Sequence, residues 1–504
     1  MKRWLSGWGL IFLLVACSKN EQPDARRETV APETTSRSYL TAVATVEAIA
    51  DPVKRCEAFP DLPGNAWPAG SAKARCRLIR AATPTRAEID TLLNQRNGAN
   101  MLEALYQQRL DAHYNDPTQP EALFLAYYAF DESEDAHRLA DIWLAKSPHS
   151  AFANLAVGKQ RISEAAKARG DKWISETSDS KVASMQRLLD EALPMLKNAL
   201  VSNPRLSPAC AGLIALGKMS GDNALRDYGI SECLKVDPLS WNVMTARLSA
   251  AEPKWGGSLD ALGNVVEEIR QRVPKNPALA SLLARRIGYE PLQLTGNDLW
   301  QQAAPGLDEA ARIAPDATFI GWAGIAARKL ENENKALIYL SQAIRFAPDA
   351  EYFLAERAGT RNALGDHSGA RRDAQRAIAL DNKYAFAYST LGEAEFELGH
   401  IDESRNAFQI AMQDPEQHQW SLQKWCETYV DPSVVEKEAL ACTATLVKEF
   451  PDDPRALFLR AWVLHKIGDP AAAAVAKHFY ARVDPKSARQ RGWVDALRGE
   501  MGDH

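Results

Sequence analysis

Apolar side chains recur at helical spacing along most of the chain, and no stretch shows the sustained alternation that is typical of a β-strand. Thr85 and Glu88 form a capping-box pattern that opens one such helix. A helical hairpin is expected over residues 120–148, and further helices are expected over residues 181–203 and 207–238. The fold class predicted from this pattern is all-α.

The C-terminal half repeats its pattern every 34 residues. The units span residues 317–350, 351–384, 385–418 and 454–487, with a degenerate unit at 420–453. Small residues recur where two helices must touch. They are Gly324, Ala358 and Gly392 at the eighth position, Ala336, Ala370 and Ser404 at the twentieth, and Ala343, Ala377 and Ala411 at the twenty-seventh. Gly365 and Gly399 mark the turn between the helices of two units. Because each hairpin exposes an apolar face that it cannot bury alone, the units are expected to stack into a solenoid.

The third unit carries the residues that identify the repeat. Tyr388, Leu391-Gly392, Gly399, Phe408, Ala411 and Asp414-Pro415 follow each other at the spacing of the tetratricopeptide repeat, and the array resembles that family. The resemblance implies a helical-hairpin solenoid that binds other proteins. The family's carboxylate clamp, with Lys and Asn at positions 5 and 9, is not matched, which argues against the recognition of chaperone tails.

In the tetratricopeptide family, positions 2, 5, 9, 12 and 13 of each first helix line a concave groove. The residues expected at this partner-binding surface are Arg328, Lys329, Tyr352, Asn362, Phe386, Ser389, Glu393, Phe396, Arg455, Phe458, Trp462 and His465. Aromatic and arginine side chains are the types that dominate interface energetics. The alternative for Trp462 is packing beneath the C-terminal segment that contains Trp493.

The first residues have the pattern of a secretion leader. Met1-Lys2-Arg3 precedes the apolar run of residues 10–16, which is too short to span a bilayer as a permanent helix. The run ends in Leu14-Val15-Ala16-Cys17, which resembles the bacterial lipobox and implies cleavage before Cys17 and lipidation of that residue. Ser18 replaces the Asp that retains lipoproteins in the inner membrane, which implies sorting to the outer membrane. The alternative is an ordinary signal peptide or an uncleaved anchor.

Residues 17–38 are rich in Ser, Thr, Glu, Pro and Arg and lack apolar periodicity, so we expect a flexible tether. Several acyl chains on Cys17 would anchor it firmly, since each buried methylene contributes ~0.8 kcal/mol. The predicted organisation is a signal peptide at 1–16, the tether at 17–38, an N-terminal helical domain at 39–300 and the repeat array at 301–504.

Six cysteines remain after Cys17, and they fall in three close pairs. The pairs are Cys56 with Cys76, Cys210 with Cys233, and Cys426 with Cys442. An even count in an exported chain favours disulfides. We favour local pairing, although the sequence alone leaves other pairings and six buried thiols open.

A distinctive motif of the N-terminal half is Pro253-Lys254-Trp255-Gly256-Gly257-Ser258, in which Ser258 can cap the following helix. Together with Trp143, Pro148, Arg169-Gly170 and Thr177, it resembles a family of bacterial domains of unknown function with a Trp-Gly-Gly-Ser signature. The resemblance covers roughly residues 50–290 and brings no known activity. Two interpretations stay open, a binding corner that presents Trp255 and an indole packed under a turn.

Charge and motif content argue against several functions. The 504 residues include 60 basic and 65 acidic ones, a net charge of −5 without a basic stripe, so no nucleic-acid partner is expected. No Gly-rich phosphate loop, His-Glu-x-x-His or Gly-x-Ser-x-Gly motif occurs. The adjacent residues Asp366-His367-Ser368 cannot align a base with a nucleophile, and His465 with His478 lacks further metal ligands in the pattern. We therefore expect neither catalysis, metal nor cofactor.

The leading hypothesis is a membrane-anchored scaffold that faces the periplasm from the bacterial outer membrane and binds envelope proteins or peptides. Two alternatives are a peptidoglycan- or glycan-binding lipoprotein and an enzyme with an unrecognised site in the N-terminal half.

Overall fold

The computed structural model describes residues 33–79, 84–170, 172–430 and 437–501, without the side chains of residues 33–35 and 488. Within these ranges the regular elements are helices and no β-strand forms, so the predicted all-α class is confirmed. None of the described helices is both long enough and apolar enough to cross a bilayer. The leader and the lipidation candidate Cys17 lie outside the described residues.

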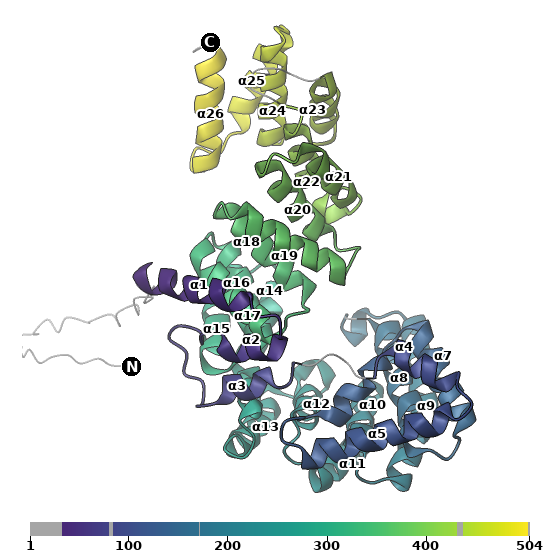
Figure 1. Cartoon of the computed structure of the whole chain (residues 1–504). Coiled ribbons are helices and arrows are strands. Elements are labelled where there is room, and N and C mark those ends of the chain that lie inside the picture. The colour runs from purple at the N-terminus through teal and green to yellow at the C-terminus, as the bar shows by residue number, and fades with distance from the viewer. Residues whose placement is uncertain (1–32, 80–83, 171, 431–436, 502–504) are drawn as a thin grey trace, which may run out of the picture.

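The chain folds into a lower lobe and a column of hairpins that rises from it (Figure 1). The α-helices of the lobe are α4 (Arg86–Leu93), α5 (Gly98–Asn115), α6 (Ala122–Ala126), α7 (Glu134–Lys146), α8 (Ala151–Arg169), α9 (Asp179–Ser202), α10 (Ser207–Ser220), α11 (Asn223–Val236), α12 (Trp241–Ala251) and α13 (Leu259–Arg272). Short 3₁₀ turns at Tyr127–Ala129, Ile174–Glu176, Pro253–Trp255 and Pro277–Leu282 connect them. One core cluster extends through this lobe from Ile89 to Leu283.

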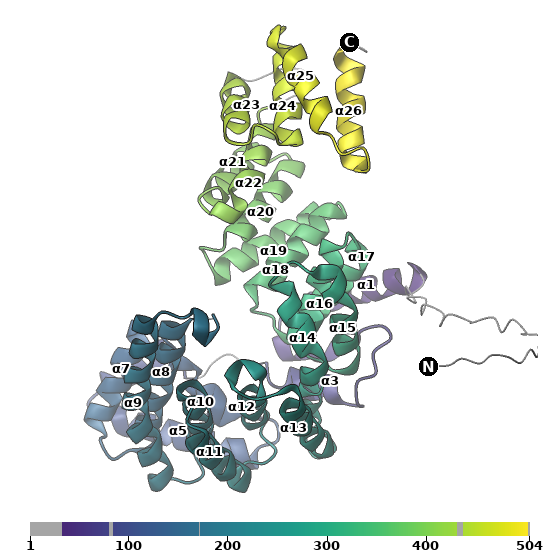
Figure 2. The ribbon, with the colours of Figure 1, turned by 180° about the vertical axis from the view of Figure 1, so that it is seen from behind.

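The column is a stack of antiparallel helix pairs, in which each pair contacts the next (Figures 1 and 2). Its helices are α14 (Arg285–Thr295), α15 (Trp300–Ile313), α16 (Ala317–Lys329), α17 (Glu333–Phe346), α18 (Glu351–Ala363), α19 (His367–Leu380), α20 (Ala385–Glu397), α21 (Ile401–Ala411), α22 (Pro415–Glu427), α23 (Lys437–Glu449), α24 (Pro454–Lys466), α25 (Ala471–Arg482) and α26 (Ala488–Met501). The helical-hairpin solenoid is therefore the observed architecture.

The small residues of the repeat lie where the sequence analysis expects helix contacts. Ala336, Ala370 and Ser404 are fully buried. A Cβ atom on Gly392 would lie 2.7 Å from the Phe408 ring, closer than packed atoms approach, so only glycine allows α20 and α21 to meet there. Gly365 ends α18 with a positive φ of 80°, as a helix-terminating glycine does.

The degenerate unit is out of register with the expected start at residue 420. Its first helix, α22, already begins at Pro415. Asp414 causes the early start, because its carboxylate accepts hydrogen bonds from the backbone N–H groups of Glu416 and Gln417, at 2.8 and 3.3 Å. The hairpin of α14 and α15 adds a further unit before residue 317, which the 34-residue alignment does not include.

The capping box at Thr85 is confirmed, as are the helices expected over 181–203 and 207–238. The hairpin expected over 120–148 differs in its first half. The backbone of Glu121 has a positive φ of 61°, and α6 spans only five residues before a 3₁₀ turn begins. The Glu121 carboxylate is buried and accepts hydrogen bonds from the Trp241 N–H and the Ser240 hydroxyl at the start of α12.

Three helices at the N-terminus lie at the base of the column, and the third of them also contacts the lobe at Pro277–Leu282 (Figures 1 and 2). They are α1 (Glu33–Glu47), α2 (Pro52–Ala58) and α3 (Ser71–Cys76), and they contact α17. Tyr39 and Val43 share a buried cluster with the repeats. Because these apolar residues dock on α17, the helix that contains them extends back to Glu33, and residues 33–38 are helical instead of part of the predicted tether.

Each cysteine pair is joined locally, as the sequence analysis favours. The structure contains the disulfides Cys56–Cys76, Cys210–Cys233 and Cys426–Cys442. The first connects α2 to α3, the second closes the α10–α11 hairpin, and the third connects α22 to α23. The disulfides therefore fasten neighbouring helices rather than distant parts of the fold.

Candidate partner-binding face

The first helices of successive repeats lie next to one another and form one continuous face. This first-helix face consists of α16, α18, α20, α22 and α24, each of which contacts the next. The twelve residues expected to bind a partner all belong to four of these helices, α16, α18, α20 and α24. The register of the repeat therefore brings together side chains that are distant in sequence.

Polar side chains of this face are paired with each other from helix to helix. The Arg328 guanidinium lies 2.5 Å from Glu356, which joins α16 to α18. The Asn362 amide donates to the Thr390 carbonyl at 2.9 Å, which joins α18 to α20. These contacts use up hydrogen-bonding groups that a ligand would otherwise take.

The pairing continues toward the C-terminus. Glu393 of α20 lies 3.3 Å from the Lys424 ammonium of α22, and Arg455 of α24 donates to Glu427 of α22 at 2.7 Å. Ser389 is fully buried and donates to the Gln417 amide oxygen at 3.1 Å. Charged residues of the face thus connect neighbouring repeats, and the partners Lys424 and Glu427 were missed because they belong to the unit whose register differs.

Three aromatic side chains of this face, or next to it, cluster around Arg328, whose pairing with Glu356 is described above. We define the aromatic corner as Arg328, Tyr352, Tyr384 and Phe386. The Arg328 guanidinium lies 5.5 Å from the centre of the Phe386 ring, and the Tyr384 and Phe386 ring centres are 6.3 Å apart. All four side chains are half-buried.

Partial burial changes the chemistry of the tyrosines in the corner. Burial raises the pKa of Tyr352 to about 12 and the pKa of Tyr384 further. Both phenols therefore stay protonated to a higher pH than a free tyrosine and can donate a hydrogen bond. Tyr384 was not expected from the repeat positions, because it directly precedes α20 instead of lying on it.

The last repeat differs, because α26 covers its first helix. The Trp493 ring stacks on Phe458 at 5.7 Å, and Phe458 lies 5.9 Å from Trp462. Leu497 of α26 is fully buried in the same cluster. Trp462 therefore packs beneath the segment that contains Trp493, which is the alternative to partner binding. In this repeat, α26 occupies the surface that a ligand would otherwise contact.

The remaining expected residues have individual environments. Lys329 is exposed, with its ammonium 5.7 Å from the centre of the Trp300 ring. Phe396 and His465 are half-buried on α20 and α24. Their roles in binding stay predictions.

Trp255 of the Trp-Gly-Gly-Ser motif packs against neighbouring helices at its turn, as the second interpretation expects, and a role in binding stays a prediction. The Arg169 guanidinium lies 4.4 Å from the centre of its ring and the Lys218 ammonium lies 4.3 Å from it. The indole is half-buried, so it is not a core residue. Cation–π contacts hold it against α8 and α10.

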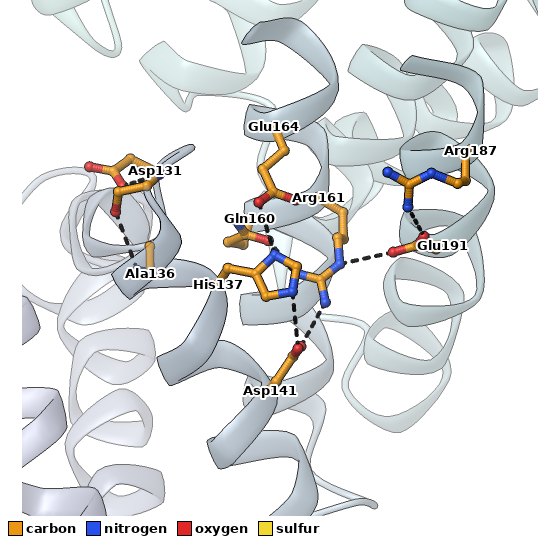
Figure 3. A network of polar contacts seen from close by, with 10 residues as sticks. Asp131, Ala136, His137, Asp141, Gln160, Arg161, Glu164, Arg187 and Glu191 are labelled. Carbon is orange, nitrogen blue, oxygen red and sulfur yellow. Dashed lines mark hydrogen bonds and ion pairs between the residues drawn. The ribbon is translucent and has the colours of Figure 1, made fainter. Parts of the chain in front are cut away.

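A polar network in the lobe contains the kinds of residue that catalysis uses (Figure 3). His137 lies between Glu164, at 2.8 Å, and Asp141, at 3.2 Å. Arg161 contacts Asp141 at 2.7 Å and Glu191 at 3.1 Å. Each carboxylate faces His137 or Arg161 on a neighbouring helix, so the network joins α7, α8 and α9.

The other polar candidates have structural partners. Asp366 caps α19 by accepting from the Gly369 N–H at 2.9 Å, and His367 faces Asn362. His478 pairs with Asp452 at 3.1 Å. Among the described residues, no group of three or more His, Cys, Asp or Glu side chains is arranged to hold a metal ion.

Stacked helical hairpins with one continuous first-helix face define a solenoid of tetratricopeptide type. The chain is 27% identical over 197 residues to the heat-shock protein cognate co-chaperone sgt12 of Aspergillus fumigatus, a match that covers 38% of this chain and 51% of that protein. It is 31% identical over 93 residues to small glutamine-rich tetratricopeptide repeat-containing protein 2 of Mycosarcoma maydis, over 18% of this chain and 26% of the relative. The matches thus span about half, or less, of the curated relatives.

No family model matches the chain. Two solved structures similar to this chain are the tetratricopeptide domain of P58(IPK), with 14% identity, a TM-score of 0.24 and coverage of 80% of this chain and 97% of that one, and the APC/C hetero-tetramer Cut9–Hcn1, with 13% identity, a TM-score of 0.35 and coverage of 82% and 98%.

Proposed function

We propose that this protein is a lipid-anchored scaffold that faces the periplasm from the bacterial outer membrane and binds envelope proteins or peptides. The observation that carries the proposal is the aromatic corner on the first-helix face. Its arginine and aromatic side chains bury a large area at a low cost in conformational entropy, which is why such residues supply most of the binding energy in protein interfaces.

The anchor is proposed from the N-terminal sequence. Leu14-Val15-Ala16-Cys17 resembles a lipobox, and Ser18 favours the outer membrane. Residues 18–32 separate Cys17 from α1, so the acylated residue and the folded body are distinct parts of the chain. The proposal places the first-helix face close to the membrane surface and within reach of envelope partners.

The relatives support the proposal that the repeats bind a protein partner, but they do not identify that partner. Both carry names that place them among co-chaperones or tetratricopeptide proteins. In the four regular units, position 5 is Gly321, Ala355, Ser389 or Phe458 in place of the clamp lysine, and Lys424 of the degenerate unit is paired with Glu393 and Glu427. We therefore propose that the partner is held by apolar side chains in the aromatic corner and that its terminal carboxylate is not required.

A glycan-binding function has less support. Sugars bind to open aromatic faces, whereas Arg169 and Lys218 already contact the ring of Trp255.

Photo-crosslinking in intact cells tests the scaffold. A photoreactive residue in place of Tyr352 should capture a specific envelope protein, and the same residue in place of the exposed Tyr228 on α11 is the control. Phe386→Ala should weaken capture at position 352 by about tenfold or more, because it removes a central aromatic anchor. Identical products from both positions, or unchanged capture with Phe386→Ala, would contradict the proposal.

Cell fractionation tests the anchor separately. Cys17→Ser should move the protein from the outer-membrane fraction to the soluble periplasmic fraction, because the acyl chains supply most of the membrane affinity. A protein that stays in the membrane fraction after this change would contradict lipid anchoring.

A further inference from the structure

A cavity lies where the N-terminal helices meet the column. Its volume is about 210 Å³, well above the ~30 Å³ that one water occupies in the liquid. Its walls come from α1 and α2 on one side and α17, α18 and α19 on the other. Six arginines and two carboxylates line it, so its walls are strongly cationic.

Part of this charge is balanced at the floor of the cavity. Arg357 pairs with Asp373 through two hydrogen bonds, at 2.8 and 2.7 Å, and also with Glu47. Arg361 lies 3.2 Å from Glu47 and 3.1 Å from Asp373. Two arginines thus face two carboxylates in a buried group of four. Arg345 is balanced by Asp61 at 2.7 Å.

Three arginines at the rim are not balanced in this way. The Arg55 guanidinium donates to the Ile49 carbonyl at 3.0 Å, and Arg376 donates to the Pro348 carbonyl. Arg376 also forms an ion pair with Asp349 at 3.5 Å, but Asp349 is largely exposed, so water screens this pair. Arg372 is exposed on α19, and no residue of the described chain is recorded as its hydrogen-bond or ion-pair partner.

The rim cations are close enough to disfavour one another. Burial and the charge of Arg376 lower the pKa of Arg55, against the smaller opposing effects of Glu47, Asp349 and Asp51. Arg372 and Arg376 lie one helical turn apart on α19, so their side chains extend from the same side of the helix. An oxyanion between these groups would relieve their repulsion and satisfy their free N–H groups.

We propose that this cavity is a binding site for a phosphate group, held by Arg55, Arg372 and Arg376 above the neutral Glu47–Arg357–Asp373–Arg361 floor. Guanidinium groups bind phosphate through paired N–H donors, and three of them from two helices match an anion with several equivalent oxygens. The phosphate belongs either to a small soluble ester or to a lipid headgroup, which share this chemistry.

Calorimetry with the full chain tests the site, using inorganic phosphate and pyrophosphate at fixed ionic strength. We expect saturable binding that Arg55→Gln weakens by about tenfold and Arg372→Gln/Arg376→Gln by more, since each loses charge-assisted hydrogen bonds. Arg489→Gln is the matched control, because Arg489 is an exposed helical arginine on α26, distant from the cavity (Figure 1). Circular dichroism of each variant verifies that the fold is retained.

Vesicles distinguish the two sources of the phosphate. If a lipid headgroup is the ligand, phosphatidic acid in phosphatidylcholine vesicles should retain the wild-type chain better than the Arg372→Gln/Arg376→Gln chain. If phosphatidic acid does not favour the wild-type chain, but inorganic phosphate or pyrophosphate binds it in solution, the ligand is a soluble phosphate. The absence of binding to folded wild-type protein in both assays, equal weakening by Arg489→Gln, or equal binding of succinate would overturn the proposal.

Discussion

Lys218 illustrates how the environment of one residue changes its charge. Its ammonium lies 4.3 Å from the centre of the Trp255 ring and donates to the Ser249 hydroxyl at 2.9 Å. Burial lowers its pKa from 10.5 to about 8, and the nearby Arg169 and Lys254 act in the same direction, against the opposing charge of Glu252. The sequence alone shows a lysine in a helix and does not predict that its pKa is lowered.

This lowered pKa predicts a dependence of stability on pH. Between about 8 and 10.5 the unfolded chain binds more protons at Lys218 than the folded chain does, so the free energy of unfolding should rise with pH in this window. From pH 7.5 to pH 9.5 we expect the free energy of unfolding to rise by roughly 1–2 kcal/mol through Lys218. Urea unfolding at both pH values measures it, and Lys218→Met should remove it.

Lys275→Met provides the control, because Lys275 is exposed. The rise in the free energy of unfolding from pH 7.5 to pH 9.5 should be the same for this variant as for the wild type. A Lys218→Met chain that keeps the full rise would show that another group causes it.

At the scale of elements, α1 is held to the column by a buried charged group as well as by apolar packing. Burial alone would raise the pKa of Glu47, but Arg357 and Arg361 lower it below its ordinary value. Arg357 and Asp373 are almost fully buried, so Glu47 compensates charge that has little access to water.

Glu47→Ala should therefore lower the free energy of unfolding by about 2–3 kcal/mol, less than for a fully buried pair because Glu47 keeps some solvent contact. Urea unfolding at pH 7 measures the loss. Because the folded-state pKa of Glu47 is lowered, its stabilisation is complete above the ordinary pKa and is lost as the pH falls through the folded-state value. The wild type and the Glu47→Ala chain should therefore have nearly the same free energy of unfolding under acid conditions.

Glu57→Ala is the matched control on α2. Glu57 forms a solvent-exposed pair with Arg77 at 3.5 Å, and such pairs contribute about 0–1 kcal/mol. Equal losses for Glu47→Ala and Glu57→Ala would mean that α1 is not held by the buried charges.

At the scale of the whole molecule, α26 closes the end of the column, where it covers the apolar surface of α24 and α25 (Figure 1). Terminal repeats of a solenoid need such a cover, since their outer face has no neighbouring repeat.

A chain that ends at Lys486 should therefore lose the burial of Leu497 and Trp493 and expose Phe458. We expect a loss of about 3–5 kcal/mol in the stability of the last hairpin and increased binding of a hydrophobic dye. Thermal unfolding and dye fluorescence measure both effects, with a chain ending at Met501 as the control. Equal melting of the two chains would show that α26 does not stabilise the array.

The sequence predicts local features well at every scale. Three features were predicted correctly: the helical periodicity, the Thr85 cap, and the small residues Gly392 and Ala370. They depend on interactions within one or two turns or between adjacent helices, so the local sequence is enough to predict them. The first-helix surface follows from the same repeat. Its electrostatic pairing does not, because Arg328 and Glu356 belong to different units and their contact depends on how the units stack.

The sequence by itself determined an all-α repeat solenoid, because the period of small and apolar residues permits one way of stacking hairpins. Only the tertiary structure decided which surfaces are available. It brings Glu47 to Arg357, 310 residues away in sequence, and so builds the cationic cavity. It also covers Phe458 with α26 and leaves the aromatic corner open to a partner. Such contacts depend on side-chain packing between distant segments, which no local pattern encodes.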